Sequence, residues 1–372
     1  MERVDKISSF LVMDIFKEAV SMHDVVHMEI GEPDLDPPPE VLEHLQRAIK
    51  ERKYFYAPSL GIWELREKIA EHYYTKYKVD VSPNRVVITP GSSGAFLVAY
   101  AITMSAGDKV LLPDPSYPCY KNFAHLLDIT PVFVAVDEKS RYTLSADMLK
   151  EYKDIKAVHI SSPNNPTGTI YTKEELSQLA YYCQEKGIYF ISDEIYHGLT
   201  YEQEDHTALE FSDRAIVISG FSKWFCMPGF RLGWMILPED MIQKAERVIQ
   251  NVFISAPTLS QYSALGAFNY TYLESVRETY RRRRDILYEG LKDIFRIPVK
   301  PEGAFYIWAD ISDYAEDSIV FCKELLKNAK VALTPGIDFG MNNTNKFIRI
   351  SFTKEESALK EGIRRIRDYL MK

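Results

Sequence analysis

From residue 85 onward, short apolar runs alternate with helix-like segments, and this alternation limits the folds open to the chain. Five runs rich in β-branched and aliphatic residues predict strands over residues 86–89, 109–112, 132–135, 157–160 and 189–192. Apolar strands that alternate with helices are typical of a mostly parallel sheet covered by helices on both faces. We therefore predict an α/β fold, with functional side chains gathered just past the carboxyl ends of the strands.

The rest of the chain predicts two further parts. After Pro238 the pattern is helical over residues 241–252 and 261–293, and it then returns to short strands and helices, as in a smaller α+β domain. Residues 9–21 predict an apolar helix that docks elsewhere on the protein. We divide the chain into an N-terminal segment that docks on the small domain or on a partner, a large cofactor-binding domain and a small C-terminal domain, over residues 1–30, 31–280 and 281–372.

Charge and cysteine usage exclude several classes of function. The 45 basic and 53 acidic residues give a net charge of −8, so no overall positive field attracts nucleic acid or anionic lipid. The basic run at residues 281–284 lies in a predicted helix and is interpreted as a solvated face. The four cysteines are widely spaced and no metal-binding motif is present. From the cysteine spacing and the lack of a metal motif we expect a cytoplasmic protein that binds no metal. Charges interrupt the apolar N-terminal segment, so we expect no membrane span.

Residues 219–234 place one lysine between two predicted core strands. Lys223 follows the run at residues 215–218 and precedes the run at residues 232–237. A lysine desolvated by neighbours such as Trp224 is shifted toward the neutral, nucleophilic form that Schiff-base chemistry requires. On this stretch alone the simpler interpretation is a solvated surface lysine, because lysines are rarely buried.

Four other loops follow predicted strands and carry polar or aromatic side chains. Residues 89–94 offer hydroxyls and backbone N–H groups for a phosphate, and residues 115–118 offer a tyrosine ring. Residues 161–168 fix an amide, and residues 192–196 place a carboxylate and a phenol. Each loop also has an ordinary interpretation, as a helix cap, a packing aromatic or a turn. Together with Lys223, however, they supply the groups that a phosphorylated pyridine aldehyde requires.

Three segments resemble motifs of one family in the order in which that family carries them. Residues 164–168, 192–196 and 220–233 resemble those of the class I aminotransferases of fold type I, the aspartate aminotransferase superfamily. The similarity extends from about residue 30 to the C-terminus. The resemblance implies a large domain built on a mostly parallel sheet, a smaller α+β domain and pyridoxal 5'-phosphate as the cofactor.

The resemblance also implies which residues hold the cofactor ring and act in catalysis. Lys223 would form the Schiff base, Asp193 would pair with the ring nitrogen, and Tyr196 would bind the ring oxygen together with Asn165. Tyr117 would stack on the pyridine. We predict Lys223, Asp193 and Tyr196 as the catalytic residues.

A second group would hold the phosphate. By resemblance, this group comprises Ser92, Ser93, Ser222 and Arg231. Tyr56 resembles the family tyrosine that reaches the phosphate of the neighbouring subunit, which implies a homodimer with shared active sites.

The substrate carboxylate would be held elsewhere. Arg349 resembles the arginine that grips the α-carboxylate, where a rigid two-pronged donor suits a planar group, and Asn165 and the Gly31 backbone would contribute. Two positions depart from the family pattern. Cys226, where the family usually has a smaller or aliphatic residue, is interpreted as a packing variation. Gly220 stands where many relatives have a phosphate-binding serine, and Ser222 is the candidate replacement.

These features predict an aminotransferase that moves the amino group of an L-amino acid to 2-oxoglutarate by a ping-pong mechanism. Aspartate is the predicted donor on family frequency, with alanine or an aromatic amino acid as alternatives, because no arginine for a side-chain carboxylate can be singled out. A second alternative is a cystathionine β-lyase, which shares the scaffold. A third is a non-catalytic cofactor-binding regulator, but the roughly thirty residues before the first motif are too few for a helix-turn-helix domain.

Overall fold

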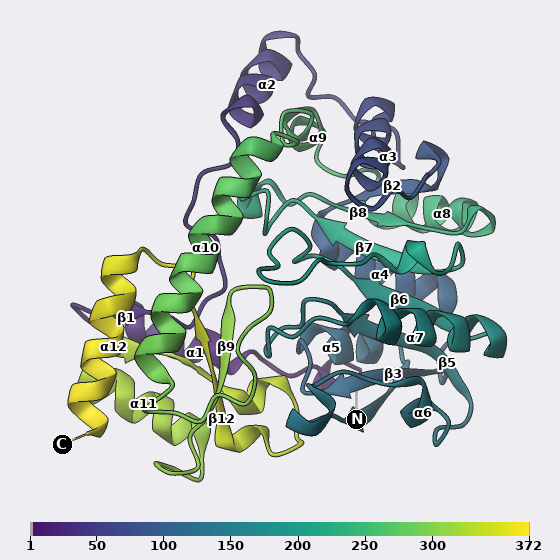
Figure 1. Ribbon diagram of the computed structural model, residues 1–372. Helices are drawn as coiled ribbons and strands as arrows, with labels where there is room; N and C mark the ends of the chain where they lie inside the picture. The colour runs from purple at the N-terminus through teal and green to yellow at the C-terminus, as the bar shows by residue number, and fades with distance from the viewer. Residues whose placement is uncertain (1–2, 372) are drawn as a thin grey trace.

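The computed structural model describes residues 3–371, and a seven-stranded sheet forms the core of its larger part (Figure 1). The strand order is β2-β8-β7-β6-β5-β3-β4. Six of the seven strands run in the same direction, and β8 runs in the opposite direction. This confirms the predicted mostly parallel sheet. The strands are β2 (Val86–Thr89), β3 (Lys109–Asp114), β4 (Thr130–Ala135), β5 (Ile155–Ser161), β6 (Tyr189–Asp193), β7 (Ile216–Gly220) and β8 (Gly233–Ile236).

Helices cover both faces of this sheet because successive side chains of a strand point to opposite faces. In β7, Ile216 and Ile218 pack in one apolar cluster, whereas Val217 belongs to the other. The first cluster includes residues of α4 (Gly91–Thr103), α5 (Cys119–Leu126) and α8 (Ile242–Val252). The second includes residues of α3 (Trp63–Tyr77), α6 (Ala146–Leu149) and α7 (Lys173–Lys186).

The register of the strands brings several loops to one edge of the sheet. Ser161 at the end of β5 pairs with Asp193 at the end of β6, and Asp193 pairs with Ile218 of β7. Because β2 and β7 are both antiparallel to β8, β2 points the same way as the parallel strands. The loops after β2, β3, β5, β6 and β7 therefore open at the same edge, as the sequence predicts.

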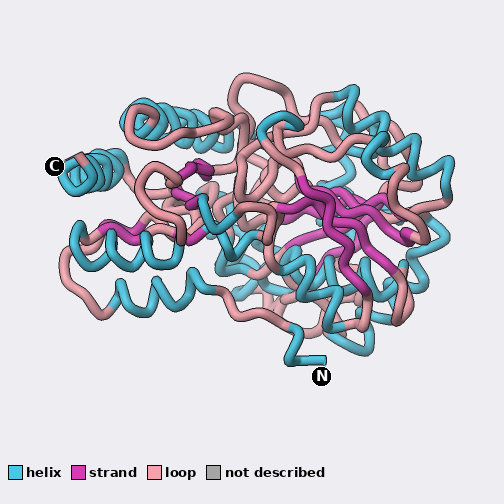
Figure 2. The backbone as a smooth tube through the Cα atoms, turned by 90° about the horizontal axis from the view of Figure 1, so that it is seen from below, coloured by secondary structure: helices cyan, strands magenta, loops and turns pink. Residues whose placement is uncertain are grey.

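The smaller part is built on short strands that lie apart from the large sheet (Figure 2). The antiparallel sheet β11-β12-β9 consists of β11 (Thr334–Pro335), β12 (Phe347–Ser351) and β9 (Tyr306–Asp310), and the parallel pair consists of β1 (Val26–His27) and β10 (Val331–Ala332). The helices α11 (Ser318–Ala329) and α12 (Glu356–Leu370) pack here. The long helix α10 (Tyr270–Leu291) leads into this part (Figure 1).

Two predicted helices differ from the structure in their limits. The helix predicted over residues 9–21 is α1 (Leu11–Val20), which packs on β10, β11 and α11. The helix predicted over residues 261–293 was wrong as a single element: α9 (Thr258–Ala264) ends early, and α10 starts anew where the Asn269 side chain caps the backbone N–H of Tyr272 at 3.1 Å. The division at residues 31 and 281 stays a prediction, and residues 1, 2 and 372 lie outside the described chain.

The remaining elements of the described chain are one further helix and eight 3₁₀ turns. They are α2 (Pro39–Lys50) and the 3₁₀ turns η1 (Arg3–Lys6), η2 (Pro83–Arg85), η3 (Glu138–Ser140), η4 (Ala208–Glu210), η5 (Pro228–Phe230), η6 (Glu239–Met241), η7 (Gly336–Phe339) and η8 (Thr344–Lys346). Within residues 3–371, no helix has the length and apolar character needed to span a bilayer. Nor does this part of the chain bring three or more His, Cys, Asp or Glu side chains together as metal ligands.

Candidate active site

A cavity of about 340 Å³ opens where the strand-end loops face the smaller part of the molecule. All but one of the side chains and backbone positions predicted for the site line it. They are Gly31, Ser92, Ser93, Tyr117, Asn165, Asp193, Tyr196, Ser222, Lys223, Arg231 and Arg349. Segments more than 300 residues apart in the sequence, Gly31 and Arg349, thus contribute to one site.

Lys223 lies in the turn after β7 and lines the cavity. Its Nζ donates to the backbone carbonyl of Gly31 at 3.0 Å and lies 5.8 Å from the ring centroid of Tyr196. Burial, followed by the positive charge of Arg349, lowers the pKa of the lysine to about 8. The interpretation as an ordinary solvated lysine is therefore wrong, because this amine loses its proton far more readily than a surface lysine does.

Asp193 ends β6 and is buried beneath the cavity. Its carboxylate accepts a hydrogen bond from the backbone N–H of Ile195 at 3.1 Å and a second from the hydroxyl of Tyr120. Burial raises the pKa of the carboxyl to about 7, against the opposing effect of these hydrogen bonds. A buried carboxylate with two donors is held in one orientation, so it can receive a cationic N–H group from a ring placed in the cavity.

The sequence reasoning missed Tyr120. It is buried on α5, three residues after Tyr117, which lies in the loop before the helix, and its ring packs on His159 with centroids 4.0 Å apart. The Tyr117 and Tyr120 rings meet edge to face with centroids 5.5 Å apart, a contact that the sequence does not mark because Tyr117 lies before the helix. His159 in turn bonds the Tyr100 hydroxyl at 2.8 Å, so a buried aromatic layer supports Asp193 from below.

Arg349 lies on β12 and is buried. Its guanidinium donates to the Asn165 side-chain oxygen at 2.9 Å and to the backbone carbonyl of Glu29 at 2.8 Å. It also lies over the ring of Tyr306, with Cζ 4.2 Å from the centroid. Its Nε has no hydrogen-bond partner among the described residues, which leaves donor capacity for an anion. This is the arrangement expected for a planar two-pronged donor that binds a carboxylate.

The start of α4 forms an anion-binding corner with Arg231. The cap position Pro90 provides no side-chain hydrogen bond, so the first N–H groups of this 13-residue helix are left for another acceptor. A Cβ at Gly91 would lie 2.8 Å from an Arg231 nitrogen, and one at Gly233 would lie 2.7 Å from the Ser92 nitrogen. The two glycines therefore let the arginine and β8 approach the helix start, where Ser92, Ser93 and Ser222 also line the cavity.

Gly220 has a packing reason to be glycine. It pairs with Gly233 across β7 and β8, and a Cβ at Gly220 would lie 3.1 Å from the Gly233 Cα and 3.1 Å from the Ile195 Cδ1. A serine at this position would crowd both neighbours. The departure from the family pattern thus accompanies a close approach of two strands.

Tyr56 is the predicted site residue that the cavity lacks. Its side chain is 82% exposed, and it lies in an exposed aromatic run with Tyr54 and Phe55 beside residues 255–259. Its predicted role requires a second subunit and stays a prediction.

The start of the N-terminal helix forms part of the cavity lining. Phe10 and Met13 line the cavity, and the Phe10 ring lies 6.4 Å from that of Tyr117. The Asp338 carboxylate accepts from the backbone N–H groups of Leu11 at 3.0 Å and of the next residue at 2.9 Å, and so caps α1. These residues were missed because their partners are distant in sequence, Tyr117 for Phe10 and Asp338 for Leu11. The apolar character of the segment was the available signal.

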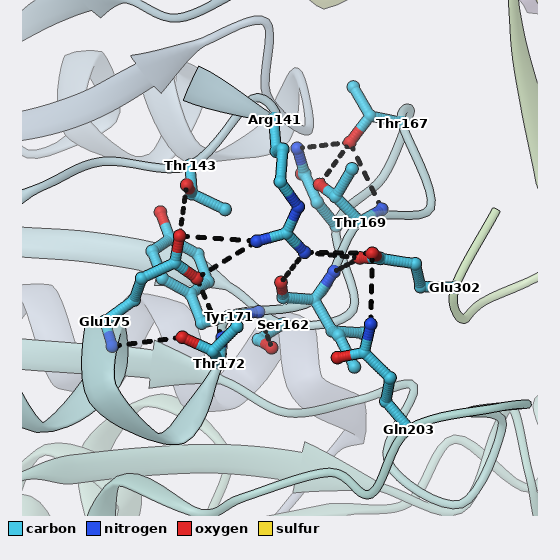
Figure 3. Close-up of polar contacts among 12 residues, drawn as sticks. Arg141, Thr143, Ser162, Thr167, Thr169, Tyr171, Thr172, Glu175, Gln203 and Glu302 are labelled. Atoms are coloured by element: carbon cyan, nitrogen blue, oxygen red, sulfur yellow. Dashed lines mark hydrogen bonds and ion pairs between the residues drawn. The ribbon is translucent and has the colours of Figure 1, made fainter. Parts of the chain in front are cut away.

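A polar network holds the loop that carries Asn165 (Figure 3). Arg141 bridges Glu302 at 2.9 Å and Glu175 at 3.3 Å, and Glu302 accepts from the backbone N–H of Ile170 at 2.9 Å. The backbone N–H groups of Glu302 and of the following glycine both donate to the Gly168 carbonyl, at 2.9 and 2.8 Å. The loop is therefore fixed from both parts of the molecule.

Comparison with known proteins agrees with this geometry. Residues 23–366 match the family described as aminotransferase class I and II. A (5-formylfuran-3-yl)methyl phosphate transaminase of Methanocaldococcus jannaschii is 40% identical, covering 100% of this chain and 99% of its own. A valine–pyruvate aminotransferase of Mycobacterium tuberculosis is 37% identical, covering 97% and 96%. The crystal structure of an aspartate aminotransferase of Thermus thermophilus superposes with a TM-score of 0.94 at 31% identity, covering 99% of this chain and 98% of that one.

Proposed function

The chain belongs to the aminotransferase class I and II family, and from this premise we propose that it moves the amino group of an L-amino acid to 2-oxoglutarate. As a member of this family it is a transaminase that uses pyridoxal 5'-phosphate. The observation that carries the proposal is that Lys223, Asp193 and Arg349 line one cavity.

The residues present fit the cofactor. When bound, pyridoxal 5'-phosphate supplies an aldehyde for an amine and a ring that withdraws electrons from the substrate α-carbon. We assign Lys223 to the aldehyde, Asp193 to the ring nitrogen and Tyr117 to the ring face. Asn165 and Tyr196 are assigned to the ring oxygen. The two donors on Asp193 and the lowered pKa of Lys223 support these roles.

The phosphate is assigned to the corner at the start of α4. Ser92, Ser93, Ser222 and Arg231 would bind it together with the free N–H groups of the helix. We also propose that the chain is a homodimer in which Tyr56 reaches the phosphate in the other subunit. The high exposure of Tyr56 and its aromatic neighbours supports this proposal.

Substrate binding and proton transfer are assigned to the other side of the cavity. Arg349 would bind the α-carboxylate through the capacity left on its guanidinium, with Asn165 and the Gly31 backbone beside it. Lys223 Nζ would carry the α-proton, since an amine with a pKa of about 8 both accepts and releases a proton near neutral pH.

The lining of the cavity supports a donor with an apolar or aromatic side chain more directly than aspartate, the choice made on family frequency. The charged side chains among the described lining are Asp193, Lys223, Arg231 and Arg349, each already assigned, and Asp338. Apolar side chains from the N-terminal segment and from the smaller part also line the cavity, namely Phe10, Val12, Met13, Ile30 and Phe339. The relatives carry names with different donors, so the lining is the better guide.

A panel of donors with 2-oxoglutarate tests the proposal. We expect parallel double-reciprocal lines, and a kcat/KM for L-phenylalanine about tenfold or more above that for L-aspartate, because an unpaired carboxylate is costly in an apolar pocket. The reverse order would contradict the side-chain assignment. Intersecting lines would contradict the two-step transfer. Pyruvate released from cystathionine without an acceptor would favour the β-lyase alternative.

A further inference from the structure

One buried tyrosine contacts three of the groups assigned above. The Tyr306 hydroxyl, at the start of β9, lies 2.9 Å from that of Tyr196. The Tyr306 ring lies under the Arg349 guanidinium, with Cζ 4.2 Å from the centroid. A Cβ at Gly31 would lie 1.8 Å from the Tyr306 hydroxyl oxygen, so this hydroxyl occupies the space that the glycine leaves. Tyr306 also lines the cavity, although its sequence context does not mark it.

The protons of the two tyrosines determine which hydroxyl donates. Burial raises the pKa of both Tyr196 and Tyr306 above the usual value, so each hydroxyl keeps its single proton at neutral pH. If the Tyr196 hydroxyl donates its hydrogen bond to the cofactor ring oxygen, it can only accept a hydrogen bond from Tyr306. Within residues 3–371 the Tyr306 hydroxyl has no other hydrogen-bond partner. Tyr306 is then the donor of the pair.

We propose that Tyr306 is a positioning residue with two separable roles, a proposal that rests on the function proposed above. Its hydroxyl donates to Tyr196 and thereby directs the Tyr196 proton toward the cofactor ring oxygen. Its ring supports the Arg349 guanidinium in the plane that meets the substrate carboxylate. One side chain thus joins the cofactor end of the site to the carboxylate end.

The hydrogen bond from the Tyr306 hydroxyl predicts the direction in which the pH midpoint of the Lys223 nitrogen shifts. With the cofactor bound, a stronger hydrogen bond from Tyr196 would stabilise negative charge on the ring oxygen. It would therefore make the Lys223 nitrogen lose its proton at a lower pH. Hydrogen bonds in series strengthen each other, and removing the Tyr306 hydroxyl weakens the Tyr196 donor. The charged groups that act on Lys223 are Arg349, Glu32, Arg231 and Asp193, and Tyr117 lies near the two tyrosines. None of these residues is changed in a Tyr306→Phe variant.

The experiment is a pH titration of the absorbance of the Lys223-bound cofactor in the holoenzyme. For Tyr306→Phe, we expect the midpoint to rise by about half a pH unit, as the loss of one modest hydrogen bond predicts. Affinity for 3-phenylpropionate, a carboxylate without an amino group, should stay within about twofold, because the ring remains. Tyr306→Leu should raise the midpoint equally and also weaken 3-phenylpropionate about fivefold, because both roles are lost.

Two comparisons isolate the effect. Tyr280→Phe is the matched control, because Tyr280 is buried against Phe305 and its hydroxyl has no partner among the described residues; its midpoint should not move. In a Tyr196→Phe background, Tyr306→Phe should add no further shift, since it acts through Tyr196. An unchanged midpoint in Tyr306→Phe, or an additive shift in the double variant, overturns the inference. A wild-type protein that shows no cofactor absorbance would instead overturn the proposed function.

Discussion

The two halves of the cavity are assembled differently. The half assigned to the cofactor is built from loops that each follow a strand of one sheet, so its side chains are fixed by local turns and by strand register. The half assigned to the substrate brings together the N-terminal helix, the Gly31 segment and β12, which meet only in the folded chain. We infer that the residues of the first half perform the reaction, whereas those of the second half select the substrate.

The largest effect is expected from Lys223→Ala. Loss of the amine should abolish the absorbance of the lysine-bound Schiff base and reduce kcat by about 10⁴-fold or more, because no other lysine lines the cavity within the described chain. Absorbance spectra and single-turnover rates measure both effects. Retained absorbance at the same wavelength would show that the chemistry lies elsewhere.

The protonation of Lys223 in the cofactor-free protein gives the next effect. Its folded-state pKa of about 8 lies below the ordinary value of 10.5, so the neutral amine predominates above about pH 8. At pH 8, an amine-selective reagent should modify Lys223 about tenfold or more faster than an exposed lysine such as Lys153, because a far larger share of Lys223 is neutral. Peptide mass spectrometry across pH 6–11 measures the midpoint, and a midpoint near 10.5 would contradict the desolvated environment.

The same shift has a consequence for stability. The unfolded chain binds a proton at Lys223 between about pH 8 and 10.5 that the folded chain does not, so the contribution of this group to stability rises with pH across that window. The gain should be absent from Lys223→Met. Urea unfolding of both cofactor-free proteins at pH 8 and pH 10 measures the difference.

Arg349→Lys should affect the substrate half alone. A lysine keeps the charge but loses the planar fork, which removes about 2 kcal/mol of carboxylate binding, or about thirtyfold in kcat/KM. The absorbance of the bound cofactor should remain, because Lys223 and Asp193 are untouched. A change in that spectrum as large as the change in kcat/KM would break the division between the halves.

The smallest effect is expected from Asp338→Asn, which retains one acceptor for α1. The loss of a capping bond and of a negative charge at a helix start costs about 1 kcal/mol, so KM should rise by about fivefold or less with kcat nearly unchanged. Faster proteolysis near residues 8–12 is the second readout. A large fall in kcat with an unchanged KM would place Asp338 in the chemistry.

Sequence reasoning reached the cofactor half because its signals are local. Lys223 and Asp193 each follow a recognisable strand, and parallel strands bring their ends to one edge. It did not reach Tyr306 or Asp338, because what matters about them is a contact with a distant segment. The break after α9 was missed for a different reason: the apolar pattern continues through it, although Asn269 provides a capping signal.

The capped N-terminal helix also affects how the protein can be handled in the laboratory. A purification tag fused at the N-terminus would join the chain nine residues before Phe10, which lines the cavity. A tag fused after α12 would leave from the outer side of the smaller part, near Met371, which is 57% exposed (Figure 1). Kinetic work on donor preference is therefore best done with the tag at the C-terminus.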